Sequence, residues 1–480
     1  MKKRDILVSN WKNAMLPLNF TFASLLNFGF YYLGLAFQEN HGREYGFIIG
    51  NILFAVLTGL TILYAIRTEH FKWYTWCLLC AVCLFYGGSF VIGVVRFGAN
   101  NLFVSYIQKF IVFCLPALFA GICAAKWRTD LEFVSVLEYQ SLFAIPAALQ
   151  YFNQILFNCN PFNWGRDFGI IGYMPFAYTL MPLLLAHMLQ FADNAEFVVP
   201  FIKKKASHPQ IVRAILIFMY WIDIYASGTR GATICVLCFC ILLVLYKVLH
   251  REALMRAGVL SCAIILIFLF NLFVYAPAGM HWLQRMNMFV EGLEEGKLVT
   301  SIEDPSVAEQ VDDLVAIDSS NPATPVTPVT PADSEDPNDS EAEAAPRIKS
   351  RGTIFELAFK EFLKSPWTGM GPGGFSAKYA MFPHNAILEL LAETGLVGTI
   401  PVLCLILFII MKLLVGGWKD KNIQYFLLFI MIYAVQANIN GTFWDCSALL
   451  CALGYGIVYT VPQKQSAKDS DDKNSGNISA

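Results

Sequence analysis

An arginine in a short polar turn between two apolar runs is the first residue that could do chemistry. Arg230 lies in Ser227-Gly-Thr-Arg-Gly231, and Asp223 is the only other charge within several residues. A guanidinium can hold phosphate oxygens through two parallel hydrogen bonds, and neighbouring glycines let backbone approach a ligand closely. The turn is therefore a candidate anion site. The alternative is an arginine at a membrane boundary whose stem lies along apolar surface, and the local sequence does not separate the two.

A second group of candidates begins at Arg351. This arginine lies just before 353–364, which has helical periodicity, and Thr353 with Glu356 forms a capping-box pattern. The positive end of that helix and its unbonded N–H groups would add to an anion site. Gly369-Met-Gly-Pro-Gly-Gly374 follows. No strand precedes this glycine-rich segment, so we interpret it as a turn that shapes the rim of a cavity, not as a nucleotide-binding loop.

A histidine opens the next predicted helix, in Pro383-His384-Asn385. Three polar residues then recur every four positions, which places Asn385, Glu389 and Glu393 on one helical face. His384 precedes this stripe by one residue. A histidine at the mouth of a membrane cavity can act as a general base near neutral pH. The alternative is an interfacial histidine that caps the helix.

Arg166 is another arginine at a predicted membrane boundary, in Asn163-Trp-Gly-Arg-Asp-Phe-Gly169. Because Asp167 is adjacent, we favour a local salt bridge over a ligand contact, without excluding the latter.

Long apolar runs must position these residues. The chain has 480 residues, of which 56% are hydrophobic and only 15% charged, with a mean hydropathy of +0.53. A soluble domain carries charges at about a quarter of its positions, so this balance indicates a membrane protein. A helix needs about 20 apolar residues to cross the hydrocarbon layer. Twelve candidate spans are 15–37, 46–66, 73–95, 103–125, 132–157, 170–192, 211–226, 231–249, 257–277, 396–415, 423–440 and 446–461.

The basic residues of the short loops predict the orientation of these spans. Alternate connections are rich in lysine and arginine, a pattern typical of the cytoplasmic side. They carry Lys2, Lys3, Arg4, Arg67, Lys72, Lys126, Arg128, Lys203, Lys204, Lys205, Lys247, Arg251, Arg256, Lys412, Lys419 and Lys421. The opposite short loops offer only Arg43, Arg96, Arg166 and Arg230. We therefore predict that both termini are cytoplasmic and that the candidate site residues lie outside.

This topology divides the chain into four parts. Residues 1–277 hold the first nine transmembrane helices, and 278–383 form a large extracytoplasmic loop before the tenth. Residues 384–461 hold an extracytoplasmic helix and the last three transmembrane helices, and 462–480 form a cytoplasmic tail. Within the loop, about 303–346 is rich in acidic residues, proline, serine and threonine, so we predict a disordered insert there. The fold class is an all-α polytopic membrane protein.

Cysteines do not change this interpretation. Cys77, Cys80 and Cys83 have a spacing compatible with an iron–sulfur or zinc site, but they lie in an apolar run and are best explained as helix-packing residues. Cys159 and Cys446 fall in predicted outside loops, and the sequence does not decide whether they pair. We expect no metal and no cofactor.

Two separated blocks resemble the signature of a known family. The first is Arg351, Glu361, Pro366, Gly369-Met-Gly-Pro-Gly-Gly-Phe375, His384-Asn385-Ala-Ile-Leu388 and Glu393-Thr-Gly395-Leu-Val-Gly398. The second is the turn Ser227-Gly-Thr-Arg-Gly231. Together with the large outside loop, they are similar to the bacterial O-antigen ligase and O-antigen polymerase superfamily.

The resemblance implies a metal-independent, inverting glycosyltransferase in the bacterial plasma membrane. Such enzymes move a glycan from an undecaprenyl-diphosphate carrier to an acceptor hydroxyl of a glycan or lipid on the outer side. Arg230 and Arg351 would hold the diphosphate, Arg166 would assist, and His384 would activate the acceptor or orient the donor. Asn385 and Glu393 would support the site. Near Arg166 the chain departs from the family, because Gly172-Tyr-Met-Pro-Phe176 lacks the usual asparagine near that proline.

Two other functions stay open. Within the family, the acceptor could be a protein, as in a protein O-oligosaccharyltransferase. From a different class, the chain could be a transporter or a lipid-glycan flippase. A transporter is expected to show inverted repeats and charges near the membrane midplane. The sequence shows no clear repeat, and its notable charges gather on one side, which favours an enzyme. Nothing indicates nucleic-acid binding.

Overall fold

The computed structural model describes ten continuous stretches and a few isolated residues. The stretches are 73–126, 133–158, 167–168, 171–196, 207–227, 229–250, 254–273, 351–417, 420–444 and 446–459, and the isolated residues are Val56, Gly59, Leu60, Leu63, Ile66 and Arg67. Several predictions fall outside the described residues. These are the span 15–37 and most of 46–66, the insert 303–346, the tail 462–480, Arg166 and both termini.

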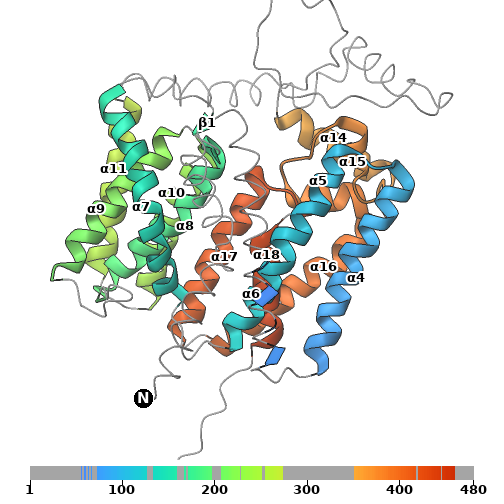
Figure 1. The fold of residues 1–480 in the computed structure, drawn as a ribbon, viewed down its shortest axis with the longest axis horizontal. Helices are drawn as coiled ribbons and strands as arrows, with labels where there is room; N and C mark the ends of the chain where they lie inside the picture. The colour runs from blue at the N-terminus through green and yellow to red at the C-terminus, as the bar shows by residue number, and fades with distance from the viewer. Residues whose placement is uncertain are drawn as a thin grey trace, which may run out of the picture.

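One group of helices comes from the middle of the chain. It contains α7 (Phe133–Asn158), α8 (Tyr173–Ala192), α9 (Pro209–Ala226), α10 (Arg230–Leu249) and α11 (Leu254–Phe273), at the left of Figure 1. These helices share a core of fully buried leucines, alanines and aromatic residues. Between α7 and α8, the two-residue strands β1 (Asp167–Phe168) and β2 (Ile171–Gly172) pair antiparallel, Asp167 with Gly172 and Phe168 with Ile171.

The second group joins helices from both ends of the sequence, at the right of Figure 1. It contains α4 (Trp73–Phe97), α5 (Asn101–Lys109), the π-helical turn η1 (Phe110–Cys114), α6 (Leu115–Lys126), α16 (Ala386–Gly417) and α18 (Ser447–Val458). Glycines bring α6 and α18 into close contact. A Cβ atom on Gly121 would lie 2.0 Å from the Cys451 carbonyl oxygen, and one on Gly454 would lie 2.1 Å from that of Leu118. Small residues at these positions let two membrane helices approach backbone to backbone.

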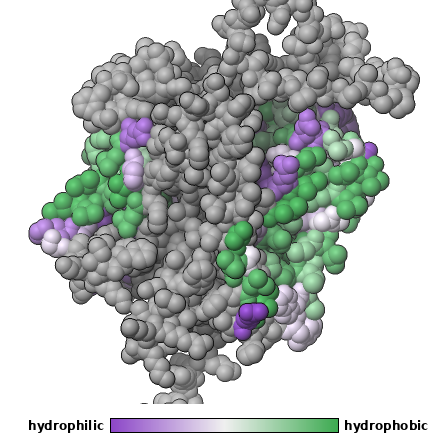
Figure 2. Space-filling view, viewed as in Figure 1, coloured by the Kyte–Doolittle hydropathy of each residue, from purple (hydrophilic) through white to green (hydrophobic). Residues whose placement is uncertain are grey.

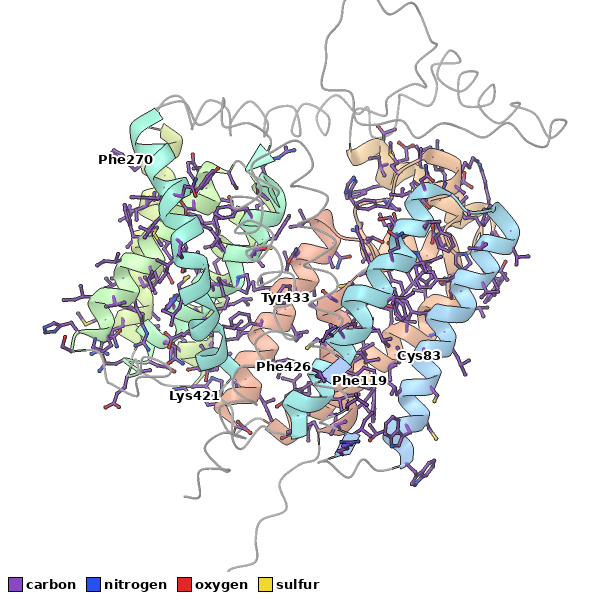
Figure 3. The ribbon with its side chains drawn as sticks, in the orientation of Figure 1. Cys83, Phe119, Phe270, Lys421, Phe426 and Tyr433 are labelled. Atoms are coloured by element: carbon purple, nitrogen blue, oxygen red, sulfur yellow. The ribbon has the colours of Figure 1, made fainter. Side chains whose placement is uncertain are left out.

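Helix α17 (Lys421–Asn440) lies between the two groups. Figure 3 shows its labelled residues Lys421, Phe426 and Tyr433 along this position. Phe429 and Ile432 belong to the core of the first group, whereas Ile423 and Phe426 belong to the core of the second. Among the described helices, α17 therefore contributes to both cores.

A small helical cap covers one end of the second group. Helices α14 (Arg351–Lys364) and α15 (Gly374–Tyr379) pack on the start of α16 through Ile354, Ala358, Phe375 and Ala392. Helix α14 begins at Arg351, two residues before Thr353, so the prediction that Thr353 caps this helix is wrong.

The predicted helix that ends at Gly395 and the predicted span 396–415 both lie within α16. The label covers two helical parts that meet at a kink, because the backbone of Gly395 (φ 59°, ψ −164°) is not helical. A Cβ atom on Gly395 would lie 2.4 Å from the Trp367 carbonyl carbon, and one on Gly369 (φ 63°) would lie 2.4 Å from that of Glu393. Only glycine fits both the positive φ and the close backbone approach. The glycine-rich segment 369–374 thus wraps the kink of α16.

The described helices agree with a membrane protein. Four of them are long and apolar enough to cross a membrane, namely Thr75–Phe97, Pro209–Ala226, Arg230–Leu249 and Ala386–Val415, and four shorter apolar helices accompany them. Large hydrophobic side chains are widely exposed on their outer surfaces, such as Leu84, Val95, Met255 and Val415. The hydrophobic residues visible over both helix groups in Figure 2 follow the same pattern. The count of twelve spans, the orientation and the placement of the loop stay predictions.

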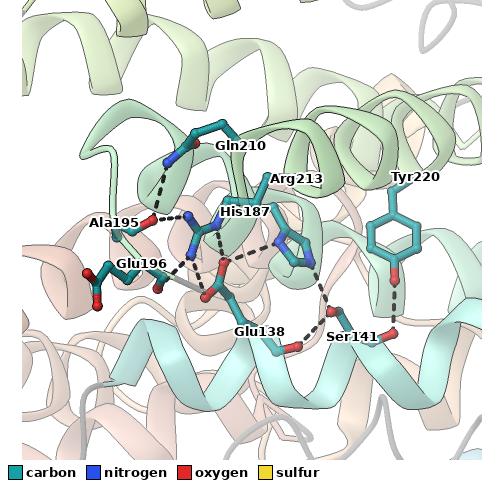
Figure 4. A network of polar contacts seen from close by, with 8 residues as sticks. All are labelled: Glu138, Ser141, His187, Ala195, Glu196, Gln210, Arg213 and Tyr220. Atoms are coloured by element: carbon teal, nitrogen blue, oxygen red, sulfur yellow. Dashed lines mark hydrogen bonds and ion pairs between the residues drawn. The ribbon is translucent and has the colours of Figure 1, made fainter. Parts of the chain in front are cut away.

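Polar residues fasten the first group at the end opposite to the cap. Arg213 of α9 makes a bidentate ion pair with Glu138 of α7, with distances of 2.7 and 3.1 Å (Figure 4). His187 of α8 lies 3.3 Å from the same carboxylate and 2.9 Å from the Ser141 hydroxyl. Tyr220 donates to the Ser141 carbonyl at 2.9 Å. The network links three buried helices, and buried charges of this kind must be paired to be tolerated.

A second ionic cluster joins the ends of three helices near the first. Asp193, just after α8, pairs with Lys247 of α10 and, at 2.8 Å, with Lys421 of α17, and it accepts a hydrogen bond from Tyr425. Burial alone would raise the pKa of Asp193. The hydrogen bonds from Lys247, Lys421 and Tyr425 outweigh that effect, and its pKa is lowered. This cluster ties α17 to the first group.

Replacing Asp193 with asparagine should lower the free energy of unfolding by about 3 kcal/mol, because Lys247 would stay buried without its counter-charge. Thermal unfolding of the purified protein in detergent measures this. The pKa of Asp193 is lower in the folded state, so its contribution is present above the pKa of an unfolded aspartate and is lost as pH falls through the folded-state pKa. Glu196→Gln, at an exposed neighbour, is the control. Equal melting temperatures for both variants would contradict the assigned role.

Candidate functional site

The arginine turn links α9 to α10 and is held by its own hydroxyl groups. The Ser227 N–H donates to the Asp223 carbonyl at 3.0 Å. The Ser227 hydroxyl donates to the Ile224 carbonyl at 2.6 Å and accepts from the Thr229 N–H at 3.2 Å. Thr229 is the N-cap residue of α10 and Arg230 is its first residue, with a half-buried side chain. The short polar turn thus sets Arg230 at the positive end of a helix, which favours anions.

The glycine after Arg230 lies close to two neighbouring helices. A Cβ atom on Gly231 would lie 2.1 Å from the Tyr178 hydroxyl oxygen of α8 and 3.5 Å from Ile439 of α17. A larger residue would require the Tyr178 side chain to move, whereas its distance from Ile439 would be an ordinary contact. The Arg230 turn therefore lies close to α8 and to the last turn of α17.

The turn before α16 places His384 in an unusual conformation. His384 has φ 57°, a left-handed value that is uncommon for residues other than glycine. Its half-buried ring packs on Phe382, with centroids 4.2 Å apart. Asn385, not His384, caps the helix, because its side-chain oxygen accepts from the N–H groups of Ile387 at 3.1 Å and Leu388 at 3.0 Å. The side chain of Asn385 thus fills the capping position, and the role of the His384 imidazole stays a prediction.

The predicted stripe of Asn385, Glu389 and Glu393 does lie on one face of α16. Its partners are the last turn of α17 and the connection from α17 to α18. Asn385 donates to the Asn438 carbonyl at 3.1 Å. Glu389 accepts from the Thr442 hydroxyl at 2.7 Å and from the Phe443 N–H at 2.6 Å.

Glu393 extends the same face and also fastens the glycine-rich segment. Its buried carboxylate accepts from the N–H groups of Gly373 at 2.8 Å and Phe375 at 3.1 Å. It also accepts from the indole N–H of Trp444 at 2.6 Å. The three polar residues of the stripe therefore hold together the cap, α16 and the end of α17.

The two motif turns meet at the last turn of α17. Ile439 lies beside Gly231, 3.5 Å from the point where a Cβ atom would be, and Gly231 follows Arg230. The Asn438 carbonyl accepts the hydrogen bond of Asn385, which follows His384. Residues far apart in the sequence are thus brought to neighbouring positions on one helix end. This is the end of the molecule that bears the cap, opposite to the cluster around Asp193 (Figure 1).

Arg351 is the first residue of α14, whose inner face packs on the start of α16. This places its backbone in the cap, although the position of its side chain lies outside the described structure. Arg166 also lies outside it, and only the backbone of its neighbour Asp167 is described. The structure therefore brings the turns of Arg230 and His384 together and leaves the roles of Arg351 and Arg166 as predictions.

The structure adds Asp223, a residue to which the sequence analysis gave no role. Its side chain is fully buried one turn before Ser227. Neither carboxylate oxygen has a hydrogen-bond partner among the residues that the structure describes. Tyr151 of α7 is close enough to interact with it electrostatically. A buried acidic residue in a membrane helix is costly and usually functional. The signal available in sequence was one acidic residue in an apolar run.

These features define a helical membrane protein in which an arginine turn and a histidine turn lie beside the last turn of α17. Residues 215–403 match the family model of the O-antigen ligase. This match supports the relation of the chain to the O-antigen ligase and polymerase superfamily. The matched region contains Arg230, Arg351, His384, Asn385 and Glu393, but not Arg166. No curated protein sequence matches the chain.

Proposed function

We propose that this protein transfers a glycan from an undecaprenyl-diphosphate carrier to an acceptor hydroxyl, as a ligase or polymerase of surface polysaccharide. The family supports a glycan-transferring membrane enzyme. The observation that carries the proposal is the meeting of the Arg230 and His384 turns on Asn438 and Ile439 of α17. Such a transfer requires a group that binds the anionic leaving group and a general base that takes the proton of the acceptor hydroxyl.

In the proposed reaction, the acceptor oxygen attacks the anomeric carbon of the donor sugar on the face opposite to the diphosphate. The bond from that carbon to the diphosphate oxygen breaks, and the electron pair leaves with undecaprenyl diphosphate. His384 takes the proton from the acceptor hydroxyl. One displacement of this kind inverts the configuration of the sugar carbon.

The arginines would stabilise the charge that develops on the leaving group. Arg230 has a planar fork at the positive end of α10, which suits two diphosphate oxygens. Arg351 would add a second charge at the start of α14, and Arg166 a third. Two or three fixed positive charges in a site that excludes water can supply the stabilisation that Mg²⁺ gives elsewhere. We therefore propose a metal-independent mechanism.

The test is a transfer assay with the purified full-length protein in lipid vesicles. The donor is a glycan on undecaprenyl diphosphate, and glycan, lipid and protein acceptors are offered separately. We expect product glycan and released undecaprenyl diphosphate, undiminished by a chelator. The acceptor that is used separates ligase, polymerase and protein O-oligosaccharyltransferase. A donor that crosses the bilayer with its glycosidic bond intact would instead establish a flippase, and chelator-sensitive transfer would reject the metal-independent mechanism.

The acidic insert is proposed to be dispensable for this chemistry. Deleting residues 305–345 should leave membrane insertion and transfer activity largely unchanged, because the segment is rich in charge and proline and poor in apolar residues. Immunoblots of membranes and the transfer assay measure the two effects. A protein that inserts normally but transfers no glycan would show that the insert is a working part of the enzyme.

A further inference from the structure

We infer that α14 and the turn after it form a lipid-contact surface, which lies in the interfacial layer of the bilayer on the side that bears the site. The surface consists of Phe359, Leu363 and Trp367 and is called the α14 stripe here. These three large side chains are 47%, 57% and 67% exposed. Phe359 and Leu363 are four residues apart in the helix and so lie on the same side. Trp367 follows the end of the helix by three residues.

The stripe is not a part of the protein core that happens to be uncovered. The core side of α14 is complete, because Ile354, Ala358 and Glu361 are buried. The Glu361 carboxylate accepts from Lys378 at 3.1 Å and from Tyr379 at 2.8 Å, both of the α15 segment. One side of α14 thus packs on α15 and α16, and another side presents Phe359 and Leu363 at the surface. A contiguous apolar surface of this kind marks an interaction site.

Its continuity with α16 indicates that the partner is lipid. The N–H of Val397 donates to the Trp367 carbonyl at 3.0 Å, and the N–H of Leu396 donates to the Pro366 carbonyl at 2.8 Å. Val397 is 63% exposed and lies inside the candidate span Ala386–Val415. Trp367 is therefore at the same level as an outward-facing residue of a membrane-spanning helix. Any lipid that covers Val397 also reaches Trp367.

The residue types of the stripe fit the boundary between hydrocarbon and water. Tryptophan is enriched at that boundary because its ring is apolar and its N–H is polar. Lys360 and Lys364 follow Phe359 and Leu363 directly, and their amino groups pair with Glu356 at 3.4 Å and Glu361 at 2.9 Å. Their stems can cover apolar surface while the charges stay in water. An amphipathic helix of this composition lies in the plane of the interface.

This placement would set the height of the cap above the membrane. The diphosphate of a polyprenyl carrier lies at the headgroup level, because its tail is held in the hydrocarbon. A cap seated by the α14 stripe keeps the start of α14, and with it Arg351, at that level. This consequence rests on the proposed function, whereas the lipid contact itself does not.

Tryptophan fluorescence of the full-length protein tests the contact without any activity assay. The protein is reconstituted in vesicles whose acyl chains carry bromine near the glycerol end. The difference in emission between the wild type and Trp367→Phe gives the fluorescence contributed by Trp367. We expect brominated lipid to quench this contribution severalfold and aqueous iodide to leave it unchanged. Trp221→Phe provides a fully buried reference that neither quencher should reach.

Two results would overturn the inference. Quenching of Trp367 by iodide alone would place the stripe in water. Protection from both quenchers would show that protein covers it, either a second copy of the chain or another segment of the same chain.

A kinetic experiment tests separately whether the α14 stripe positions the cap for the polyprenyl-linked donor. The double variant Phe359→Ser, Leu363→Ser should raise the KM for the polyprenyl-linked donor severalfold with little change in kcat. A donor on a short water-soluble chain should be unaffected. If lipid quenching is seen but the protein transfers no glycan at all, the contact stands and the proposed function fails. If transfer is seen and the KM for the polyprenyl donor does not change, the positioning role of the stripe fails.

Discussion

Replacing Arg230 with lysine should lower glycan transfer by about 10²-fold, although the positive charge is kept. Lysine presents a point charge and cannot make the two parallel hydrogen bonds of a guanidinium to diphosphate oxygens. Arg230→Ala should be at least as severe. The measurement is initial rate of product formation in vesicles at saturating acceptor, with protein level in the membrane determined in parallel. Arg351→Ala should fall in the same range if Arg351 holds the same diphosphate.

The controls separate ligand binding from folding. Arg230 is the first residue of α10, and its side chain is half-buried. The turn before it is held by Ser227 and Thr229, so Arg230→Lys should leave the protein level in the membrane unchanged. Arg256→Lys, at an exposed arginine of α11, makes the same chemical change away from the site and should keep full activity. Full activity of Arg230→Lys, Arg230→Ala and Arg351→Ala together would eliminate the diphosphate site as proposed.

Replacing His384 with asparagine should also reduce transfer by about 10²-fold or more, the usual scale for the loss of a general base. Asparagine is the sharper choice, because it tolerates the left-handed backbone that His384 adopts at φ 57°. A loss of activity can then be assigned to the missing imidazole and not to a disturbed turn. His384→Ala should show the same loss if the backbone turn is kept.

The pH profile distinguishes a base from an orienting residue. If the imidazole accepts the acceptor proton, kcat of the wild type should fall as the histidine becomes protonated at acid pH, and the residual rate of His384→Asn should lack that acid limb. His208→Ala, at an exposed histidine on the N-cap position of α9, should behave as wild type. A wild-type rate for His384→Asn across this range would remove His384 from the mechanism.

Much of the architecture could be predicted from the sequence because the signals are local. Apolar runs of about 20 residues predict helices in lipid, and ten of the predicted spans, from 73–95 onward, coincide with described helices. The Arg230 turn could be located because its small and hydroxyl-bearing residues, Ser227, Thr229 and Gly231, lie between two such runs. The spacing of Asn385, Glu389 and Glu393 correctly predicts one shared helical face, since that follows from helix geometry alone.

What this face contacts could not be predicted. Glu389 and Glu393 bind Thr442, Phe443 and Trp444, and such pairings depend on how α16 packs against the connection from α17 to α18. The sequence correctly indicates that a helix ends at Gly395, where the backbone is not helical. Only the structure shows the close approach of Trp367 that requires a glycine there.

The sequence by itself determined the class of this protein, its helices and the two motifs by which it resembles a known superfamily. It did so because hydropathy, helical periodicity and motif residues act within a few turns of chain. The tertiary structure decided that the Arg230 and His384 turns meet on Asn438 and Ile439. It also decided that the Asn385 side chain, and not that of His384, caps the start of α16. Asp223 is buried one turn before the arginine turn. These are contacts between elements distant in sequence, and such contacts arise only when the helices have packed around α17.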